Sequence, residues 1–315
     1  MKKRLIVVLI VFGFFVILLA LIPKSFINEK PKVVIVLKVL NSQYWELIKA
    51  GAEKGFKDFG IEGKVVAPDD GSHEGQIEML EVVMKENPGI LIISPIYPDN
   101  MISYLEGVVE KNTPVMLIDT DALWQNKTTY IGTDNVSLGE RAGALLGSQL
   151  QPGNEVAIIG VDSIGPVAEE RIHGAKVSLE AIGIKVVTEE IDVSYGPLQV
   201  KEAVGTILEE YPRVKGIIAT NDGMALDAVE AIQKEGLTIP VIGTDGINEM
   251  IELIEEGTLP GTVAQNPYDM GYLSVEAAMK VIEGGHVDRT IDSGVDIIVK
   301  GNAKNRLDFQ KKLLR

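Results

Sequence analysis

The feature that most constrains the fold is an alternation of short apolar runs with longer amphipathic segments. Four apolar runs come first, and a helix-length segment follows each except the last; they span residues 33–37, 64–67, 90–94 and 115–119. Short apolar runs separated by helices are typical of buried parallel strands joined by crossover connections. This part of the chain therefore predicts an α/β fold built on a parallel sheet.

The same pattern starts again further along the chain, with apolar runs at residues 155–160, 184–190, 216–220 and 241–245. A length of 315 residues allows two lobes, each with its own core. A further helix (268–283) and a late strand (295–299) remain, and we expect them to exchange between the lobes. The predicted boundaries are 1–30 for an anchor and linker, 31–132 plus 265–294 for an N-terminal lobe, and 133–264 plus 295–315 for a C-terminal lobe.

An uncharged apolar stretch of 18 residues, Leu5–Ile22, follows three cations near the N-terminus. It is long enough to cross a bilayer as a helix, and the cations would keep the N-terminus in the cytoplasm. A cleaved signal peptide is the alternative, but the small-x-small cleavage site is missing, since Ala20 is followed by Leu21, Ile22 and Pro23. We therefore predict a single-pass membrane anchor with the binding domain outside the cytoplasm, and secretion after signal cleavage as the alternative.

Composition excludes several classes of function. The formal net charge is −15 and the chain has no basic stripe, which argues against nucleic-acid binding. The absence of cysteine rules out disulfides, thiolate zinc sites and thiol nucleophiles. The three histidines are far apart in the sequence, so we expect no metal site. Because the sequence also has no nucleophile elbow and no P-loop, we expect no cofactor and no enzymatic activity.

Polar residues directly after the predicted strands carry most of the functional information, because ligands of open parallel sheets bind beyond the carboxyl ends of the strands. Asp119, Asn221 and Asp245 hold such positions. Asp and Asn are also favoured at helix N-caps, so each of these residues has a purely structural alternative. Binding and capping remain alternative roles for all three.

Three glycines, Gly139, Gly143 and Gly147, recur at four-residue spacing in a predicted helix. In an apolar membrane helix this spacing would indicate dimerisation, but Glu140 and Arg141 interrupt the apolar character here. We interpret the spacing as a sign that this helix packs closely on a sheet.

Several short segments, in this order, are those of a known family: LNSQYW (40–45), LID (117–119), IGTDNVSLG (131–139), ERIHGA (170–175), TNDGMAL (220–226), VIGTDG (241–246) and VAQNP (263–267). Over about residues 32–300 the chain resembles the type I periplasmic sugar-binding proteins, and its pattern is most similar to the ribose-binding group. The resemblance implies two Rossmann-like lobes with parallel sheets, a three-segment hinge, and a sugar held in the cleft between the lobes.

The resemblance also implies which residues contact the sugar. They are Asn41, Ser42, Tyr44, Trp45, Asp119, Arg171, Tyr195, Asn221, Asp245 and Gln265. A sugar presents vicinal hydroxyls and apolar C–H faces, so planar polar side chains and aromatic walls suit it. Tyr44 and Trp45 are the expected walls. Arg171 has an alternative role as a solvated helix residue that pairs with Glu169 or Glu170.

Three positions depart from the ribose-binding pattern: Lys38 replaces a small polar residue, Thr120 an arginine and Thr244 an aromatic residue. We therefore expect another pentose or a hexose. The combination of Lys38 with Asp119 and Asp121 resembles the pattern of the autoinducer-2 binding proteins, in which a strand-end lysine and an Asp-x-Asp pair face the ligand. A ligand of that kind is therefore a less favoured alternative. Lys38 and Thr120 complete the set of candidate ligand-binding residues, although Lys38 could instead only neutralise an aspartate.

The predicted function is that of an extracytoplasmic monosaccharide-binding protein that closes over its sugar and presents it to an ABC permease. The alternative is a membrane-anchored co-receptor that senses the sugar for a histidine kinase, because a transmembrane anchor without a lipid-accepting cysteine suits a sensor. A sugar-responsive repressor would need an N-terminal helix-turn-helix, and the chain has a hydrophobic stretch there instead.

Overall fold

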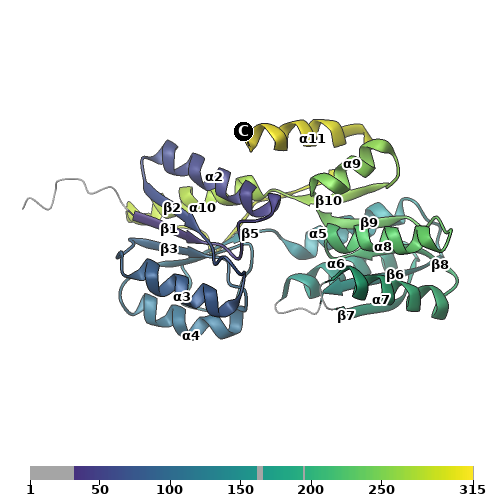
Figure 1. Cartoon of the computed structure of the whole chain (residues 1–315), viewed down its shortest axis with the longest axis horizontal. Helices are drawn as coiled ribbons and strands as arrows, with labels where there is room; N and C mark the ends of the chain where they lie inside the picture. The colour runs from purple at the N-terminus through teal and green to yellow at the C-terminus, as the bar shows by residue number, and fades with distance from the viewer. Residues whose placement is uncertain (1–31, 162–165, 194–195, 315) are drawn as a thin grey trace, which may run out of the picture. The chain divides into compact units, whose positions relative to one another are not determined.

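The computed structural model describes residues 32–314 except 162–165 and 194–195. The predicted N-terminal anchor lies outside the described residues. Among the helices that are described, none has the length and apolarity to span a membrane. The described residues form two six-stranded sheets with helices on both faces of each (Figure 1).

The first sheet and its helices form what we call the N-lobe. Its strands are parallel and follow the order β11-β5-β4-β3-β1-β2. The strands are β1 (Lys32–Val36), β2 (Glu62–Val66), β3 (Ile90–Ile93), β4 (Val115–Ile118), β5 (Tyr130–Gly132) and β11 (Thr290–Asp292). The helices are α2 (Gln43–Phe59), α3 (His73–Met84), α4 (Pro98–Val109) and α10 (Pro267–Ile282).

The second sheet, in what we call the C-lobe, has the order β12-β10-β9-β8-β6-β7. Its strands are β6 (Glu155–Val161), β7 (Lys185–Val193), β8 (Val214–Ala219), β9 (Val241–Asp245), β10 (Gly261–Gln265) and β12 (Val295–Ile298). Its helices are α5 (Asn135–Gly147), α6 (Pro166–Ala181), α7 (Pro197–Glu210), α8 (Asp222–Lys234), α9 (Asn248–Glu256) and α11 (Lys300–Leu313).

The expectation of parallel sheets needs one correction, because β12 runs antiparallel to β10. A parallel neighbour requires a crossover helix within the same lobe. β12 instead enters the C-lobe directly from β11 of the N-lobe, through the short connection at Ser293 and Gly294. The C-lobe sheet is therefore parallel except at this edge.

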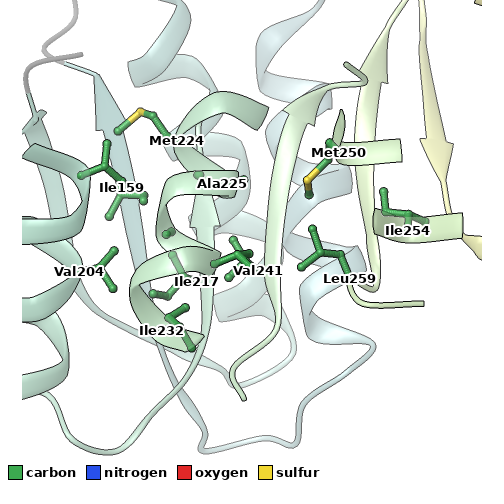
Figure 2. Packing of buried hydrophobic residues seen from close by; sticks show 14 of the residues in the cluster. Ile159, Val204, Ile217, Met224, Ala225, Ile232, Val241, Met250, Ile254 and Leu259 are labelled. Atoms are coloured by element: carbon green, nitrogen blue, oxygen red, sulfur yellow. The ribbon is translucent and has the colours of Figure 1, made fainter. Parts of the chain in front are cut away.

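Most of the apolar runs of the sequence are central strands that are buried on both faces, whereas the runs at 64–67 and 184–190 fall on the edge strands β2 and β7. Val33 and Ile35 pack against α2 and α10, whereas Val34 and Val36 belong to the cluster formed with α3 and α4. The C-lobe is built in the same way, and Figure 2 shows Ile217 of β8 within the cluster that α7 and α8 cover. Burial on both faces explains why these strands have no alternation of polar and apolar residues.

The glycine spacing in α5 reflects contact with a helix rather than with a sheet. A Cβ on Gly139 would overlap the carbonyl oxygen of Arg171, and one on Gly143 would lie 2.6 Å from the carbonyl oxygen of Ala175. Both carbonyls belong to α6. The expectation of close helix-to-sheet packing was therefore wrong, and the small residues let α6 and Arg171 approach α5 closely.

The strand order creates one expected ligand-binding position in each lobe, and the two positions correspond. In each lobe the strand order reverses next to the first strand, between β1 and β3 and between β6 and β8. Open parallel sheets bind ligands outside the carboxyl ends of the strands at such switch points. The chain passes between the lobes three times, from β5 to α5, from β10 to α10 and from β11 to β12.

Candidate ligand-binding cleft

A cavity of about 590 Å³ lies at the carboxyl ends of the strands and is lined by residues of both lobes. Nine of the predicted site residues line it: Asn41, Ser42, Tyr44, Trp45, Asp119, Arg171, Asn221, Asp245 and Gln265. Two more predicted residues, Lys38 and Thr120, lie beside Asp119. The remaining predicted residue, Tyr195, lies outside the described residues.

Five lining residues were not predicted from the sequence: Gln43, Gly223, Leu226, Ile247 and Glu249. Gln43 lies inside the LNSQYW segment, and Gly223 and Leu226 lie inside TNDGMAL, so the motifs contained a signal for these three. Ile247 and Glu249 follow VIGTDG at the start of α9, and no motif or pattern indicated a role for them.

A second cavity of about 600 Å³ lies at the starts of α4 and α6. Its charged lining residues are all acidic: Asp99, Asp121, Glu169 and Glu170. The first cavity instead combines one cation, Arg171 of α6, with carboxylates and amides that end or follow five strands. We therefore take the first cavity as the candidate ligand-binding cleft and call it the cleft.

In the N-lobe half of the cleft, Asp119 is oriented by several donors. Tyr44 Oη donates to Oδ1 at 2.7 Å, and Thr120 Oγ1 and Ser94 Oγ donate to Oδ2 at 2.9 and 3.2 Å. Lys38 Nζ lies 3.6 Å from Oδ2 and donates to Thr120 Oγ1 at 2.6 Å. The Asp119 carboxylate is therefore fixed in position, and its charge is balanced by the Lys38 ammonium.

The two predicted aromatic walls lie side by side at the start of α2. The rings of Tyr44 and Trp45 meet edge to face, with centroids 5.3 Å apart and planes at 87°. Lys38 Nζ lies 5.8 Å from the centroid of the Trp45 ring. Burial, followed by the nearby carboxylates of Asp119 and Asp245, raises the pKa of Tyr44 well above its ordinary value. The Tyr44 phenol therefore stays protonated and acts as a hydrogen-bond donor.

In the C-lobe half, the buried Arg171 side chain holds the loops after β8 and β9 together. Its Nη1 shares two protons among three acceptors: the carbonyl oxygen of Thr220 at 2.7 Å, Thr244 Oγ1 at 2.9 Å and Asp245 Oδ1 at 3.0 Å. Its Nε donates to Asn135 Oδ1 at 3.0 Å. The alternative of a solvated Arg171 is therefore wrong. Among the described residues, none accepts from its Nη2.

Gln265, at the end of β10, connects the two halves of the cleft. Its Nε2 donates to Asp245 Oδ1 at 2.6 Å. Its Oε1 accepts from Thr133 Oγ1 at 2.8 Å and lies 3.2 Å from Tyr44 Oη, whose single proton is shared between this oxygen and the nearer Asp119 Oδ1. Burial raises the pKa of Asp245, while the charge of Arg171 opposes this shift. A continuous chain of polar contacts thus runs from Asp119 through Tyr44 and Gln265 to Asp245.

The structure also bears on the capping alternatives. Asn221 is the N-cap of α8 and accepts from the backbone N–H of Met224 at 2.8 Å. It lines the cleft as well, so capping and ligand contact are compatible at this residue. In the described part of the chain, neither Asp119 nor Asp245 is an N-cap: the element that follows Asp119 is the strand β5, and α9 begins only after Ile247. Both backbones have positive φ, 66° and 123°, an arrangement that non-glycine residues adopt at a cost.

Asp222, which sequence reasoning missed, supports the turn that carries Asp245. Its Oδ2 accepts from the backbone N–H groups of Gly246 at 2.6 Å and Ile247 at 3.0 Å, and its Oδ1 accepts from Thr262 Oγ1 at 2.7 Å. The side chain is fully buried. Burial, together with the charge of Asp245, raises the pKa of Asp222 to about 7 despite these three donors.

This pKa predicts a pH-dependent stability. An unfolded aspartate titrates near 3.9, so between pH 4 and 7 the folded protein binds more protons than the unfolded chain at this site. The stabilising contribution is complete below about pH 4 and is lost as the pH rises through about 7. We expect the free energy of unfolding to fall by about 2–3 kcal/mol from pH 5 to pH 8 through this group, measured by urea denaturation.

Asp222→Asn is the matched variant for this measurement. Its amide oxygen can accept from Gly246 and Ile247, and its amide nitrogen can donate to Thr262, but it does not titrate. We expect this variant to lose about 2–3 kcal/mol less than the unaltered protein over the same pH range. An equal loss in both proteins would contradict the assignment to Asp222.

Comparison with known proteins identifies the family of this chain. Residues 33–286 match the family described as periplasmic binding protein domain. The chain belongs to this family. The match spans both lobes, and it confirms the membership that the sequence motifs predicted.

Curated relatives of this periplasmic binding protein include two that are named for sugars. The D-allose-binding periplasmic protein of Escherichia coli (strain K12) is 28% identical over 266 residues, which covers 80% of this chain and 85% of the relative. The ribose import binding protein RbsB of Bacillus subtilis (strain 168) is 29% identical over 257 residues, or 82% and 83% of the two chains.

Solved structures share the fold closely. The periplasmic ribose ABC transporter structure from Conexibacter woesei DSM 14684 aligns with a TM-score of 0.82 and 22% identity, covering 89% of this chain and 95% of that chain. GanP, a glucose-galactose binding protein from Geobacillus stearothermophilus, aligns with a TM-score of 0.79 and 25% identity, covering 87% and 99%. The two-lobed architecture of this periplasmic binding protein is therefore that of its relatives.

Proposed function

We propose that this periplasmic binding protein holds a monosaccharide, a pentose or hexose, in the cleft and presents it to an ABC permease. The observation that carries the proposal is the chain of polar contacts from Asp119 through Tyr44 and Gln265 to Asp245 and Arg171. It places oriented carboxylate, amide, phenol and guanidinium groups around one cavity. The relatives named for allose and ribose support the same ligand class.

The chemistry of these groups suits sugar hydroxyls. A carboxylate or amide can bond two neighbouring hydroxyls, and Arg171 Nη2 supplies a further donor. Tyr44 and Trp45 offer apolar surface for the C–H face of the ring. A site built on such bonds rejects analogues that lack a hydroxyl, because its own buried groups would remain unpaired.

The same contacts support binding rather than catalysis. The carboxylates of Asp119 and Asp245 are each engaged by a cation and by neutral donors, so they serve to orient the ligand. The described residues contain no group of three or more side chains that could hold a metal. We therefore propose that the protein releases its ligand unchanged.

Ligand-driven closure is the proposed mechanism. The cleft takes contacts from both lobes, so a sugar binds most tightly when both lobes reach it at once. Its differential affinity for that arrangement shifts the population of lobe orientations. A membrane partner can then distinguish the liganded protein by the surface that the two lobes form together.

The autoinducer-2 alternative receives little support. Its Asp-x-Asp pair requires Asp121 to face the ligand together with Asp119. Asp121 instead pairs with the buried Lys127 and does not line the cleft. Lys38 lies beside Asp119 and Thr120, where it can both neutralise Asp119 and donate to a ligand hydroxyl.

The membrane anchor and the partner belong to the proposal as well. Leu5–Ile22 and its preceding cations support a single-pass anchor with the lobes outside the cytoplasm, and secretion after cleavage is the alternative. An anchored protein could equally serve a sugar-sensing histidine kinase. N-terminal sequencing of the mature protein separates the two forms, since a cleaved signal peptide would leave a new N-terminus beyond the apolar stretch.

Isothermal titration calorimetry against a panel of sugars tests the proposal. The panel contains pentoses, hexoses, polyols and autoinducer-2. We expect one pentose or hexose to bind with a dissociation constant in the micromolar range or below. A response to autoinducer-2 alone would shift the ligand class, and no response to any compound would reject the sugar-binding function.

A further inference from the structure

Helix α9 of the C-lobe begins without a cap of its own. Its N-cap residue, Ile247, has no side-chain acceptor for the free N–H groups of the first turn. Asp222 accepts the two N–H groups that precede the helix, those of Gly246 and Ile247. The next N–H group, that of Asn248, donates to Gln43 Oε1 at 3.2 Å.

Gln43 is the first residue of α2 and belongs to the N-lobe. The bond to Asn248 therefore joins residues that are 205 positions apart and lie in different lobes. A side-chain acceptor at a helix start contributes to the stability of that helix. The cap of α9 is thus supplied by the opposite lobe and depends on how the two lobes are arranged.

Two polar atoms at the same contact have no partner among the described residues. Gln43 Nε2 and Asn248 Oδ1 are both buried and make no hydrogen bond there. One is a donor and the other an acceptor, and the two residues are already linked, because the Asn248 backbone N–H donates to Gln43 Oε1. Leaving such atoms unpaired is unfavourable, so a movement that brings them together is favoured.

The contact lies at the edge of the cleft. Gln43 lines the cavity from the N-lobe, and Ile247 and Glu249, the neighbours of Asn248, line it from the C-lobe. A ligand that draws the lobes together narrows the cavity at this edge. Because Gln43 and Asn248 lie in different lobes, the same movement changes the separation between Gln43 Nε2 and Asn248 Oδ1.

We propose that Gln43 is a positioning residue that couples the two lobes: it caps α9 across the cleft, and it gains a second hydrogen bond, to Asn248 Oδ1, when the cleft narrows. The part of this inference that concerns ligand affinity rests on the proposed function. The capping of α9 by the opposite lobe does not.

Four variants separate the two bonds. Gln43→Met removes both bonds and keeps the length of the side chain. Asn248→Ala removes only the second bond, because its backbone N–H remains. Asn248→Asp is the matched control, since it keeps an oxygen acceptor and an acidic residue suits a helix N-terminus. The double variant Gln43→Met/Asn248→Ala tests whether the two residues act together.

The sugar identified by the calorimetric panel is the ligand for these variants. We expect Gln43→Met to weaken its binding about tenfold and Asn248→Ala about threefold, as the loss of two bonds and one bond implies. Asn248→Asp should bind as the unaltered protein does, and the double variant should match Gln43→Met. If Asn248→Ala binds normally while Gln43→Met is weak, Gln43 contacts the ligand itself and the second bond is refuted.

A distance measurement tests the cap without any ligand. The chain has no cysteine, so Glu81→Cys on α3 and Glu209→Cys on α7, both exposed, provide the only thiols for spin labels. We expect Gln43→Met to broaden the distribution of interlobe distances in the ligand-free protein, and Asn248→Asp to leave it unchanged. Identical distributions in the Gln43→Met and unaltered proteins would overturn the coupling, whether or not a sugar binds.

Discussion

Asp119→Ala is expected to weaken sugar binding by about a hundredfold or more and to leave the fold intact. The change removes the acceptor that Tyr44, Ser94 and Thr120 orient toward the cleft. It also leaves Lys38 without its countercharge, although Lys38 keeps its bond to Thr120. Calorimetric titration with the best sugar of the panel measures the loss, and circular dichroism checks the fold.

Asp99→Ala is the matched control for this experiment. Asp99 is also an N-lobe aspartate, but it is exposed at the start of α4 and lines the second cavity instead of the cleft. Its replacement should leave the affinity unchanged. If Asp99→Ala lost affinity and Asp119→Ala kept it, the ligand would bind in the second cavity and our choice of cleft would be wrong.

Arg171→Met should lower the free energy of unfolding by about 3 kcal/mol and also abolish binding. Arg171 and Asp245 form an ion pair at 3.0 Å with side-chain exposures of only 7% and 22%. Removing the guanidinium leaves the Asp245 carboxylate partly buried without its cation. It also removes the bonds to Thr220 and Thr244 that hold the loops after β8 and β9. Urea denaturation at constant pH measures the change.

Lys176→Met, on the same helix, controls for the loss of a cation from α6. Lys176 pairs with Glu189 at 2.5 Å, but its side chain is 35% exposed. Exposed pairs contribute little, so we expect a loss of less than about 1 kcal/mol. Equal losses in the two variants would show that the burial of Arg171 has no special energetic role.

The sequence predicted the regular part of the fold well, because buried parallel strands leave a local signature. The runs at residues 90–94 and 216–220 are apolar since helices cover both faces of β3 and β8. The antiparallel direction of β12 had no such signature. It depends on where the preceding strand lies in space, and the pattern of a single edge strand does not record that.

The residues of the candidate site also fall into those that the sequence predicted and those that it did not. Asp119 and Asp245 could be found because they directly follow apolar strands, and the motifs supported them. Gln43 and Asp222 also lie inside family-like motifs, but their roles could not be predicted, since each resembles an ordinary polar residue at the start of a helix. Their partners lie 205 residues away at Asn248 and 24 residues away at Gly246, and only the fold brings them together.

The exchange of segments between the lobes has a consequence for how the protein folds. The face of the N-lobe sheet that packs on α2 also needs α10, through Met270 and Val275, and its edge strand β11 ends at Asp292. When the first 132 residues leave the ribosome, the helix α10 that completes one face of the sheet and the edge strand β11 have not yet been made. Contacts between segments so distant in sequence form slowly. The N-lobe cannot be completed until nearly the whole chain has been made, so the early strands remain accessible to chaperones or an export machinery during synthesis.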